Sequence, residues 1–301
     1  MNEQGREPPI EYMQRTCAYY QALQFGDPYR WAQHDNVPFT PFLKPLAEAS
    51  IALVTTAVIF DPQYGDQGPS AKYNGAAKFF DVYAESTSGD PDLRISHIAI
   101  DRNHTTAADQ NSYFPLAALR RAADNGIIGN IAPNFYGLPT DRDQQCTVDQ
   151  YGNDILALCK KDHVDAVLLF PNCPVCHQSV SLVARHLEAN GIPTVVTGCA
   201  KDIVEYCGVP RFVFGDFPLG NSAGKPFDQG SQTQVLALGL ELLVSASIPG
   251  QTLINPDHWA GTDAWKSDYC NIEDLDPEEC ARLKLEFQHQ QQLGYSKKKT
   301  A

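Results

Sequence analysis

The chain has few basic residues and no long apolar run. Lysine and arginine total 23 against 36 aspartate and glutamate residues, which gives a net charge of −13 at pH 7. Phosphate backbones and anionic membrane surfaces are bound through basic patches, and a membrane-spanning helix needs about 18 or more consecutive apolar residues. We therefore expect no nucleic-acid partner and no membrane partner.

The sequence also lacks the marks of a secreted, disulfide-bonded protein. The stretch Met1–Ile10 is polar, contains two prolines and has no apolar run behind it, so it does not read as a signal peptide. The nine cysteines are an odd number, which does not suit a disulfide scaffold. We therefore predict a reduced, cytoplasmic protein, and we also expect a homo-oligomer.

Nucleotide-binding motifs are absent as well. The chain contains neither Gly-x-Gly-x-x-Gly nor Gly-x-x-x-x-Gly-Lys-Ser/Thr, the two glycine-rich patterns that cradle phosphates. The loop 217–226 does contain Gly220, Asn221 and Lys225. Its backbone N–H groups and its lysine offer a site for a carboxylate, so these three residues are candidates for binding an anionic substrate.

The most informative stretch is 164–178, in which a short apolar run ends at Pro171 and two cysteines follow. An apolar run of this length bounded by a breaker is typical of a strand buried on both faces. A helix is predicted next, which places Cys173 and Cys176 in the turn before it, where free N–H groups favour a thiolate. One thiolate can attack while the second thiol resolves the adduct, and His177 can supply or accept a proton.

Strands that alternate with helices predict an α/β fold with a parallel, Rossmann-like (flavodoxin-like) sheet. From residue 149 the pattern is regular: helix 149–161, strand 164–170, helix 178–190, strand 193–197, helix 200–207, strand 211–214 and helix 231–245. Elsewhere we predict helix 12–23, strands 51–60, 93–100 and 127–131, helix 115–124 and a surface helix at 275–293.

The 301 residues suffice for one large α/β domain or for two of about 150 residues, and we expect two lobes around a cleft. The predicted parts are an aromatic-rich N-terminal wrap (1–45), an N-terminal α/β lobe (46–145), a C-terminal α/β lobe with the Cys-x-x-Cys-His motif (146–250), and a C-terminal extension and tail (251–301). The polar stretch 134–146 suggests the division.

Ligands of a parallel sheet bind at the carboxyl ends of its strands. The cysteine turn, the loop 217–226 and Cys199, which follows strand 193–197, are all expected at that edge. Cys199 is therefore a further candidate for the border of the substrate site.

Two histidines flank the end of the second predicted strand, and His97 is a candidate substrate-binding residue. With Asp101 and Asp109, His97 and His104 would form a substrate or metal site. The simpler interpretation is that His97 is a hydrogen-bonded core residue and His104 a loop residue.

A metal site is an alternative use of the cysteines. Cys173, Cys176 and Cys199, completed by His177 or Cys207, would bind zinc or an iron–sulfur cluster. The chain has no second Cys-x-x-Cys, so the ligands would come from loosely spaced residues. No resident cofactor is otherwise indicated.

Two further readings of the thiols are weaker. A racemase-like enzyme needs a second thiol that faces Cys173 across the substrate, and Cys17 and Cys146 are poor candidates. Cys-x-x-Cys-His is also the attachment signature of a c-type haem, but haem attachment requires export, and Met1 and Met13 are the only methionines available as axial ligands.

The surroundings of the cysteines resemble a known family. The segment 164–193, with Cys-Pro-Val-Cys-His-Gln-Ser-Val and then Ala-Arg-His-Leu-Glu-Ala-Asn-Gly-Ile-Pro, is similar to the selenoprotein B family of glycine, sarcosine, betaine and D-proline reductases. Phe-Pro-Leu-Gly in 217–226 and weaker pieces at 37–41, 94–97 and 114–116 extend the resemblance over most of 30–245.

The resemblance implies a reductive cleavage of a C–N bond. The family's selenocysteine position matches Cys173 and its partner position matches Cys176, so residue 173 would attack the carbon next to a carboxylate and displace the amine. Lys225 or Arg211 would meet the carboxylate. The family also implies partners, namely a pyruvoyl-bearing subunit and a selenoprotein A, and a thiol electron donor. A thiol at 173 is a weaker nucleophile than a selenol, which puts the rate and the reaction itself in question.

Overall fold

A computed structural model describes residues 6–26, 29–273 and 275–298. Its strands are β1 (Ser50–Thr55), β2 (Val58–Ile59), β3 (Tyr83–Ser86), β4 (Leu93–Arg94), β5 (Asn130–Ile131), β6 (Asn134–Gly137), β7 (Ala166–Phe170), β8 (Thr194–Gly198), β9 (Arg211–Phe214) and β10 (Gln251–Ile254). The main sheet has the order β10-β9-β8-β7-β1-β6-β3, with β5 also paired to β1, and β2 and β4 form a separate pair. All pairs of the main sheet are parallel except β3 with β6.

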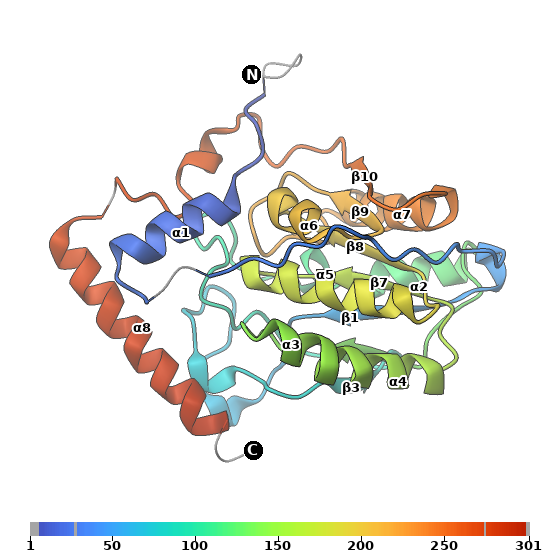
Figure 1. Ribbon diagram of the computed structural model, residues 1–301, viewed down its shortest axis with the longest axis horizontal. Helices are drawn as coiled ribbons and strands as arrows, with labels where there is room; N and C mark the ends of the chain where they lie inside the picture. The colour runs from blue at the N-terminus through green and yellow to red at the C-terminus, as the bar shows by residue number, and fades with distance from the viewer. Residues whose placement is uncertain (1–5, 27–28, 274, 299–301) are drawn as a thin grey trace.

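Helices cover both faces of this sheet (Figure 1). The helices α2 (Leu116–Asp124) and α7 (Gln229–Ser245) contribute to one hydrophobic cluster, and α4 (Asn153–Lys161) and α5 (Pro174–Ala189) contribute to the other. Alternate residues of β1 belong to the two clusters, because successive side chains of a strand point to opposite faces. The short helix α6 (Lys201–Cys207) follows β8.

The predicted α/β fold with a mostly parallel sheet is confirmed. The expected pair of lobes is not what the structure shows, since strands from both sides of residue 145 lie in one sheet. The register aligns Ile51 of β1 with Ala166 of β7, and β1 also pairs with β6. The physical reason is that the backbone N–H and C=O groups at both edges of β1 need hydrogen-bond partners, which β6 and β7 supply from the two sides of residue 145. The residue boundaries of the four predicted parts stay a prediction.

Two differences in the elements concern the site. The helix α5 begins at Pro174 rather than at 178, so Cys176 and His177 lie in its first turn instead of in a loop. The predicted strand 51–60 is broken after Thr55, and β2 turns away to pair with β4.

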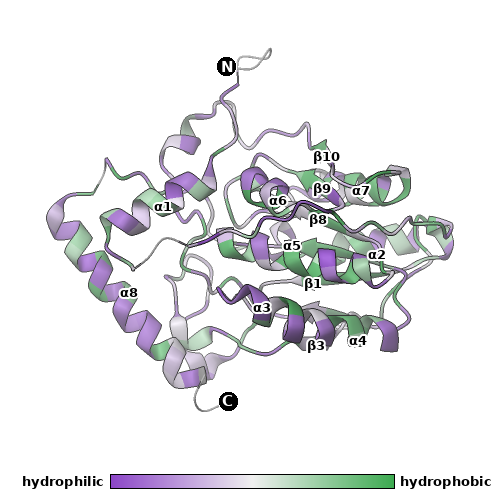
Figure 2. Ribbon diagram, in the orientation of Figure 1, coloured by the Kyte–Doolittle hydropathy of each residue, from purple (hydrophilic) through white to green (hydrophobic). Residues whose placement is uncertain are grey.

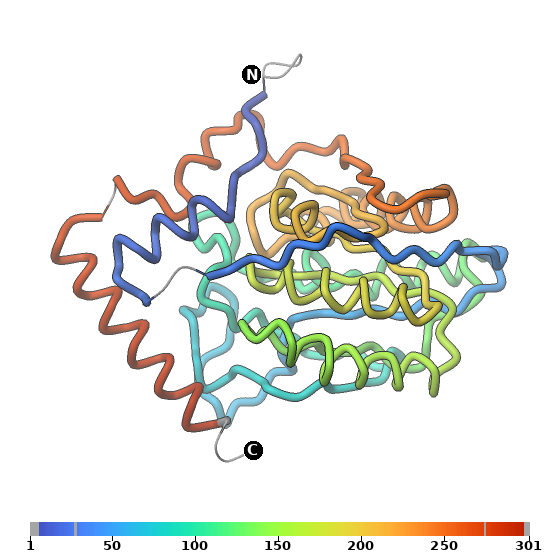
Figure 3. Tube along the Cα trace, viewed as in Figure 1, coloured from blue at the N-terminus to red at the C-terminus, as the bar shows by residue number. Residues whose placement is uncertain are grey.

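The two ends of the chain lie beside the sheet. Helices α1 (Tyr12–Ala22) and α8 (Pro277–Lys298) lie together at the left of Figure 1, and Phe25 stacks on Phe287 with ring centroids 4.2 Å apart. The chain after α1 runs extended along α5 (Figure 3), where the N–H of Ala32 donates to the side chain of Gln178 over 2.6 Å.

Hydropathy separates the sheet from α8. The strands are largely apolar, whereas α8 is mainly hydrophilic with scattered apolar positions (Figure 2). Within the described ranges, the long helices are all too polar to cross a membrane.

Candidate functional site

The cysteine turn is held by hydrogen bonds on both sides. Cys173 is the N-cap of α5, and its Sγ accepts a hydrogen bond of 3.2 Å from the N–H of Cys176. Just before it, the backbone and side-chain amides of Asn172 both donate to Oγ1 of Thr56, over 3.2 and 3.1 Å. The turn after β7 is therefore tied to the end of β1, and both sulfurs have fixed positions.

His97 and Thr140 complete a small polar cluster around the sulfurs. Oγ1 of Thr140 lies 3.2 Å from Sγ of Cys176 and 3.1 Å from Nε2 of His97. The ligand-capable atoms of His97, Cys173 and Cys176 all lie within 4.8 Å of one another. Among the described residues, none hydrogen-bonds to the buried Nδ1 of His97. This cluster joins the loop after β4, the segment after β6 and the start of α5.

The two thiols differ in acidity because they share a proton. Burial raises the pKa of Cys173, and the hydrogen bond and negative charge of Cys176 raise it further. Burial opposes ionisation of Cys176 too, but the hydrogen bond from Cys173, His97 and the hydroxyl of Thr140 together hold its pKa well below the usual value. The contacts around the pair thus make Cys176 the more acidic of the two thiols.

A thiolate is expected in the reduced protein below the pH at which exposed thiols ionise. Its ultraviolet absorbance should disappear in Cys176→Ser. In Thr140→Val it should shift to higher pH, because one donor to the sulfur is lost. Cys199→Ser is the control and should leave this titration unchanged. If no thiolate absorbance appears below the pH range in which ordinary thiols ionise, the assignment of the low pKa to Cys176 is wrong.

Both ring nitrogens of His177 are occupied by backbone hydrogen bonds, and the proton transfer expected of His177 stays a prediction. Its Nδ1 lies 2.8 Å from the carbonyl oxygen of Cys173, and its Nε2 accepts a hydrogen bond of 2.9 Å from the N–H of Cys199. Burial lowers the pKa of His177 to about 4, so the ring is neutral. Gly198 is required beside it, since an added Cβ would lie 2.6 Å from Nε2. The imidazole thus connects the backbone that follows β7 to the backbone that follows β8.

A cavity of about 330 Å³ opens beside the cysteine turn. Cys173 lines it, whereas Cys176 is fully buried and lies behind. The walls come from α1, α8, the segments around 73–80 and 96–99, and 140–142 after β6. Cys173 is therefore the sulfur that a small molecule would meet first.

Several residues of the cavity were not predicted, and Arg142 is the most important. Its guanidinium lies over the rings of Tyr20 and Tyr29, 5.3 and 5.9 Å from their centroids. Thr140 and Arg142 follow β6, a strand without an apolar run in the sequence. The aromatic residues before position 45 were visible in the sequence, but their convergence on Cys173 required the fold.

Cys199 does not join the site. Its side chain belongs to a separate apolar cluster with Ile10, Tyr12 and Ile203, and it is absent from the lining of the cavity. Burial raises the pKa of Cys199 above its usual value. The predicted metal set Cys173, Cys176 and Cys199 is thus replaced by Cys173, Cys176 and His97.

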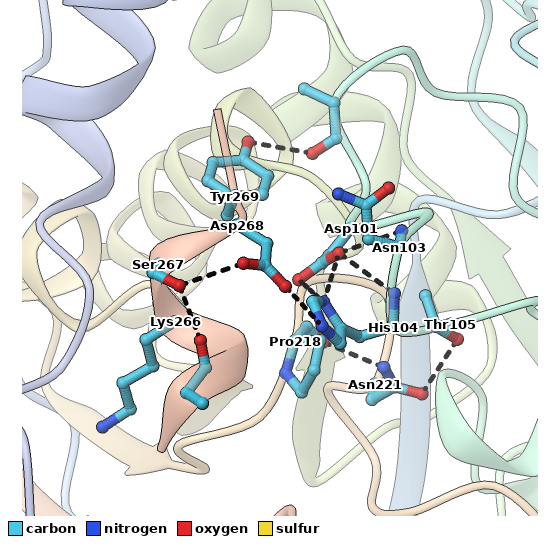
Figure 4. Close-up of polar contacts among 12 residues, drawn as sticks. Asp101, Asn103, His104, Thr105, Pro218, Asn221, Lys266, Ser267, Asp268 and Tyr269 are labelled. Carbon is cyan, nitrogen blue, oxygen red and sulfur yellow. Dashed lines mark hydrogen bonds and ion pairs between the residues drawn. The ribbon is translucent and has the colours of Figure 1, made fainter. Parts of the chain in front are cut away.

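The loop 217–226 is occupied by structural contacts instead of bordering the cavity. Figure 4 shows Asn221 between Pro218 and Thr105; its Nδ2 donates 2.9 Å to the Pro218 carbonyl, and its Oδ1 accepts from Thr105 over 3.3 Å. Gly220 packs against Thr105 with φ of 106°. The loop therefore serves to hold the segment 100–105.

Lys225 and Arg211, the two cations expected to bind the substrate carboxylate, each form an ion pair within the protein. Nζ of Lys225 lies 2.8 Å from Oδ1 of Asp257, and the fully buried Arg211 lies 2.7 Å from Glu188. A charge already compensated by a carboxylate is a poor receptor for a second one. Neither Lys225 nor Arg211 is therefore free to bind the expected carboxylate.

The structure distinguishes the two candidates for a second thiol that faces Cys173. Cys17 of α1 lines the same cavity as Cys173, whereas Cys146 lies outside it.

The His104 ring, next to Asp101 and Asp268, bridges two carboxylates at 3.0 and 3.1 Å (Figure 4). It ties the segment 100–105 to the chain before α8 and is not part of the thiol cluster.

Comparison with known proteins identifies relatives. The family described as Glycine/sarcosine/betaine reductase selenoprotein B matches residues 18–171, which ends just before the cysteine pair. The chain is 30% identical over 219 residues to the D-proline reductase subunit gamma of Acetoanaerobium sticklandii, covering 72% of this chain and 88% of the relative. No solved structure matches.

More distant relatives are longer than the matched region. The Glycine reductase complex component B subunit gamma of Symbiobacterium thermophilum is 25% identical over 76% of this chain and 54% of its own length. The Sarcosine reductase complex component B subunit beta of Peptoclostridium acidaminophilum is 24% identical over 66% and 46%. The chain thus spans about half the length of these two. The family match and the D-proline reductase relative together place the chain in the glycine/sarcosine/betaine reductase selenoprotein B family.

Proposed function

We propose that the chain is a component of a thiol-dependent reductase that cleaves a C–N (or C–X) bond of a small carboxylate-bearing substrate. Its relatives are named as subunits of D-proline, glycine and sarcosine reductases. The observation that carries the proposal is the arrangement of the sulfurs: Cys173 lines a cavity, and Sγ of the fully buried Cys176 lies within 4.8 Å of Sγ of Cys173. The pKa of Cys176 is held below its usual value by its contacts.

The first step uses Cys173 as the nucleophile. Its thiol passes the proton to the Cys176 thiolate as Sγ attacks the carbon next to the carboxylate. The C–S bond forms, the C–N bond breaks, and the protonated amine leaves as a neutral amine. A fixed acceptor within reach of the nucleophile is the usual means of activating such a group, and here the acceptor is the second sulfur.

The second step completes the reduction. Sγ of Cys176 attacks Sγ of Cys173, the C–S bond breaks, and the carbon takes the proton that Cys176 received. The substrate gains two electrons and the dithiol becomes a disulfide, which an external thiol donor reduces by exchange. We include a partner reductase subunit in the proposal because the relatives are named as parts of complexes.

Release of amine coupled to disulfide formation tests this function. Reduced protein is incubated anaerobically with amino acids and N-alkyl amino acids, with the candidate partner subunit present, and amine and disulfide are measured. One disulfide per amine is expected. Cys173→Ala should lose the release, and Cys199→Ser should retain it. Undiminished release by Cys173→Ala would overturn the mechanism.

Metal binding is the second candidate function, and His97 is the observation that favours it. The Nδ1 of His97 is buried and unpartnered among the described residues, and the ligand atoms of His97 and the two cysteines lie within 4.8 Å of one another, a donor set that suits a three-ligand zinc site with an open fourth position. Elemental analysis and thiol counting on anaerobically purified protein separate the two. About one equivalent of zinc or iron, with both cysteines shielded from alkylation, would support the metal function. Metal-free protein with a reactive Cys173 would support the reductase.

A further inference from the structure

Eight of the 25 residues that line the cavity beside Cys173 are aromatic. Tyr20, Tyr29, Trp31, Tyr73 and Phe79 all line it, together with rings from α8. Aromatic and apolar walls of this kind hold apolar groups by burying their surface. A substrate that consisted only of charged groups would leave these walls in contact with water.

The volume also exceeds what the smallest amino acids need. Bulk water occupies about 30 Å³ per molecule, so a cavity of about 330 Å³ corresponds to roughly ten water molecules. Volumes of about 300 Å³ and above are those of sites that take ligands with a ring or a branched chain. The space is therefore large enough for an apolar substituent in addition to the reacting carbon and its carboxylate.

Arg142 and Lys78 are the lysine and arginine residues that line this cavity, and Arg142 is the one whose guanidinium can bind a carboxylate through two donors. Among the described residues, no carboxylate forms an ion pair with Arg142, whose guanidinium lies against Tyr20 and Tyr29. The neighbouring Arg102 is not available in the same way, because its donors are used by backbone carbonyls, including those of His97 at 2.6 Å and Ile98 at 2.9 Å. Arg142 offers the planar donor geometry that suits carboxylates.

Arg142 and Cys173 both influence the pKa values of Tyr20 and Tyr73. The pKa of Tyr20 is raised to about 12, first by burial, and both Arg142 and Cys173 contribute to its electrostatic environment. The same two residues contribute to that of Tyr73, whose pKa is also raised mainly by burial. The cation and the sulfur thus both line the cavity and both influence the same two tyrosines.

We propose that the cavity binds a carboxylate with a bulky apolar substituent, with Arg142 binding the carboxylate and the aromatic walls contacting the substituent. The proposal rests on the proposed function, since it identifies the class of substrate that would be presented to Cys173. It makes Arg142 a binding residue and Phe79 a determinant of specificity.

Calorimetric titration of the reduced full chain with phenylacetate and with acetate tests the proposal. Phenylacetate is expected to bind at least about tenfold more tightly than acetate, because only its ring buries apolar surface. Arg142→Gln should weaken phenylacetate binding by about tenfold or more, through loss of a charge-assisted contact. Phe79→Ala should remove most of the preference for phenylacetate. Arg121→Gln, on α2 and outside the cavity lining, is the matched control.

Protection of Cys173 from alkylation locates the bound ligand. Phenylacetate should slow the alkylation in the wild type and not in Arg142→Gln, whose cysteine should react normally without ligand. Equal affinity for acetate and phenylacetate, unchanged binding in Arg142→Gln, or binding that does not protect Cys173 would each overturn the proposal. If phenylacetate binds as expected but Cys173 is unreactive even without ligand, the proposed function fails while the ligand class stands.

Discussion

Cys173→Ser is expected to abolish covalent capture of bromoacetate at position 173, lowering the rate by roughly a thousandfold or more because the nucleophile itself is removed. Bromoacetate carries a leaving group on the carbon next to a carboxylate, so it reports on the first step alone. Cys173 lines the cavity, whereas Cys176 is fully buried. Capture in the wild type should therefore occur on Cys173, as read by peptide mass spectrometry.

Cys176→Ser should have a different effect from Cys173→Ser. The negative charge of Cys176 is one reason why the pKa of Cys173 is raised, after burial. Its removal should shift the alkylation of Cys173 to lower pH while preventing disulfide formation. Cys17→Ser is the control, since Cys17 lines the same cavity. Adducts on Cys176 in preference to Cys173 would contradict the assigned order of the two sulfurs.

The sequence was sufficient for the strands that are buried on both faces. The runs at 51–54 and 166–170 are apolar throughout because both faces of β1 and β7 pack against helices. The sequence does not predict the short strand β6, since Asn134–Gly137 has no apolar run and lies in the polar stretch that suggests a division of the chain. Pairing with β1 places it in the core, where Phe135 and Tyr136 are fully buried.

Position in the chain predicted the site only in part. The cysteine pair could be located because a strand, a breaker and a helix are all local signals. The involvement of His97 and Thr140 with Cys176 is not local, since it depends on how two loops meet at the sheet edge. Conversely, Cys199 follows a neighbouring strand as expected, but its side chain packs into an apolar cluster. A position at the carboxyl edge of the sheet therefore does not determine which way a side chain points.

The buried pair of Glu188 and Arg211 gives the largest stability effect that we expect. Both side chains are fully buried, with Oε1 and Nη1 2.7 Å apart. Glu188→Ala should lower the free energy of unfolding by about 3–5 kcal/mol, because the guanidinium is left buried without its counter-charge. Lys44→Ala is the control; its pair with Asp165 is partly exposed, and its loss should cost less than about 1 kcal/mol. Urea unfolding measures both.

Glu188 should matter more than Arg211, and the reason connects stability with the cavity. Its carboxylate also accepts hydrogen bonds from the N–H groups of Thr40 and Thr194, over 2.5 and 2.6 Å, so it fastens the extended segment before β1 to the sheet. In Arg211→Met the carboxylate keeps both donors, and the loss should be smaller than in Glu188→Ala. The same segment carries Tyr29 to the wall of the cavity, so Glu188→Ala should also expose it to proteolysis and weaken phenylacetate binding. A Glu188→Ala protein as stable as Arg211→Met would mean that the ion pair, not the anchoring of the segment, is what this carboxylate provides.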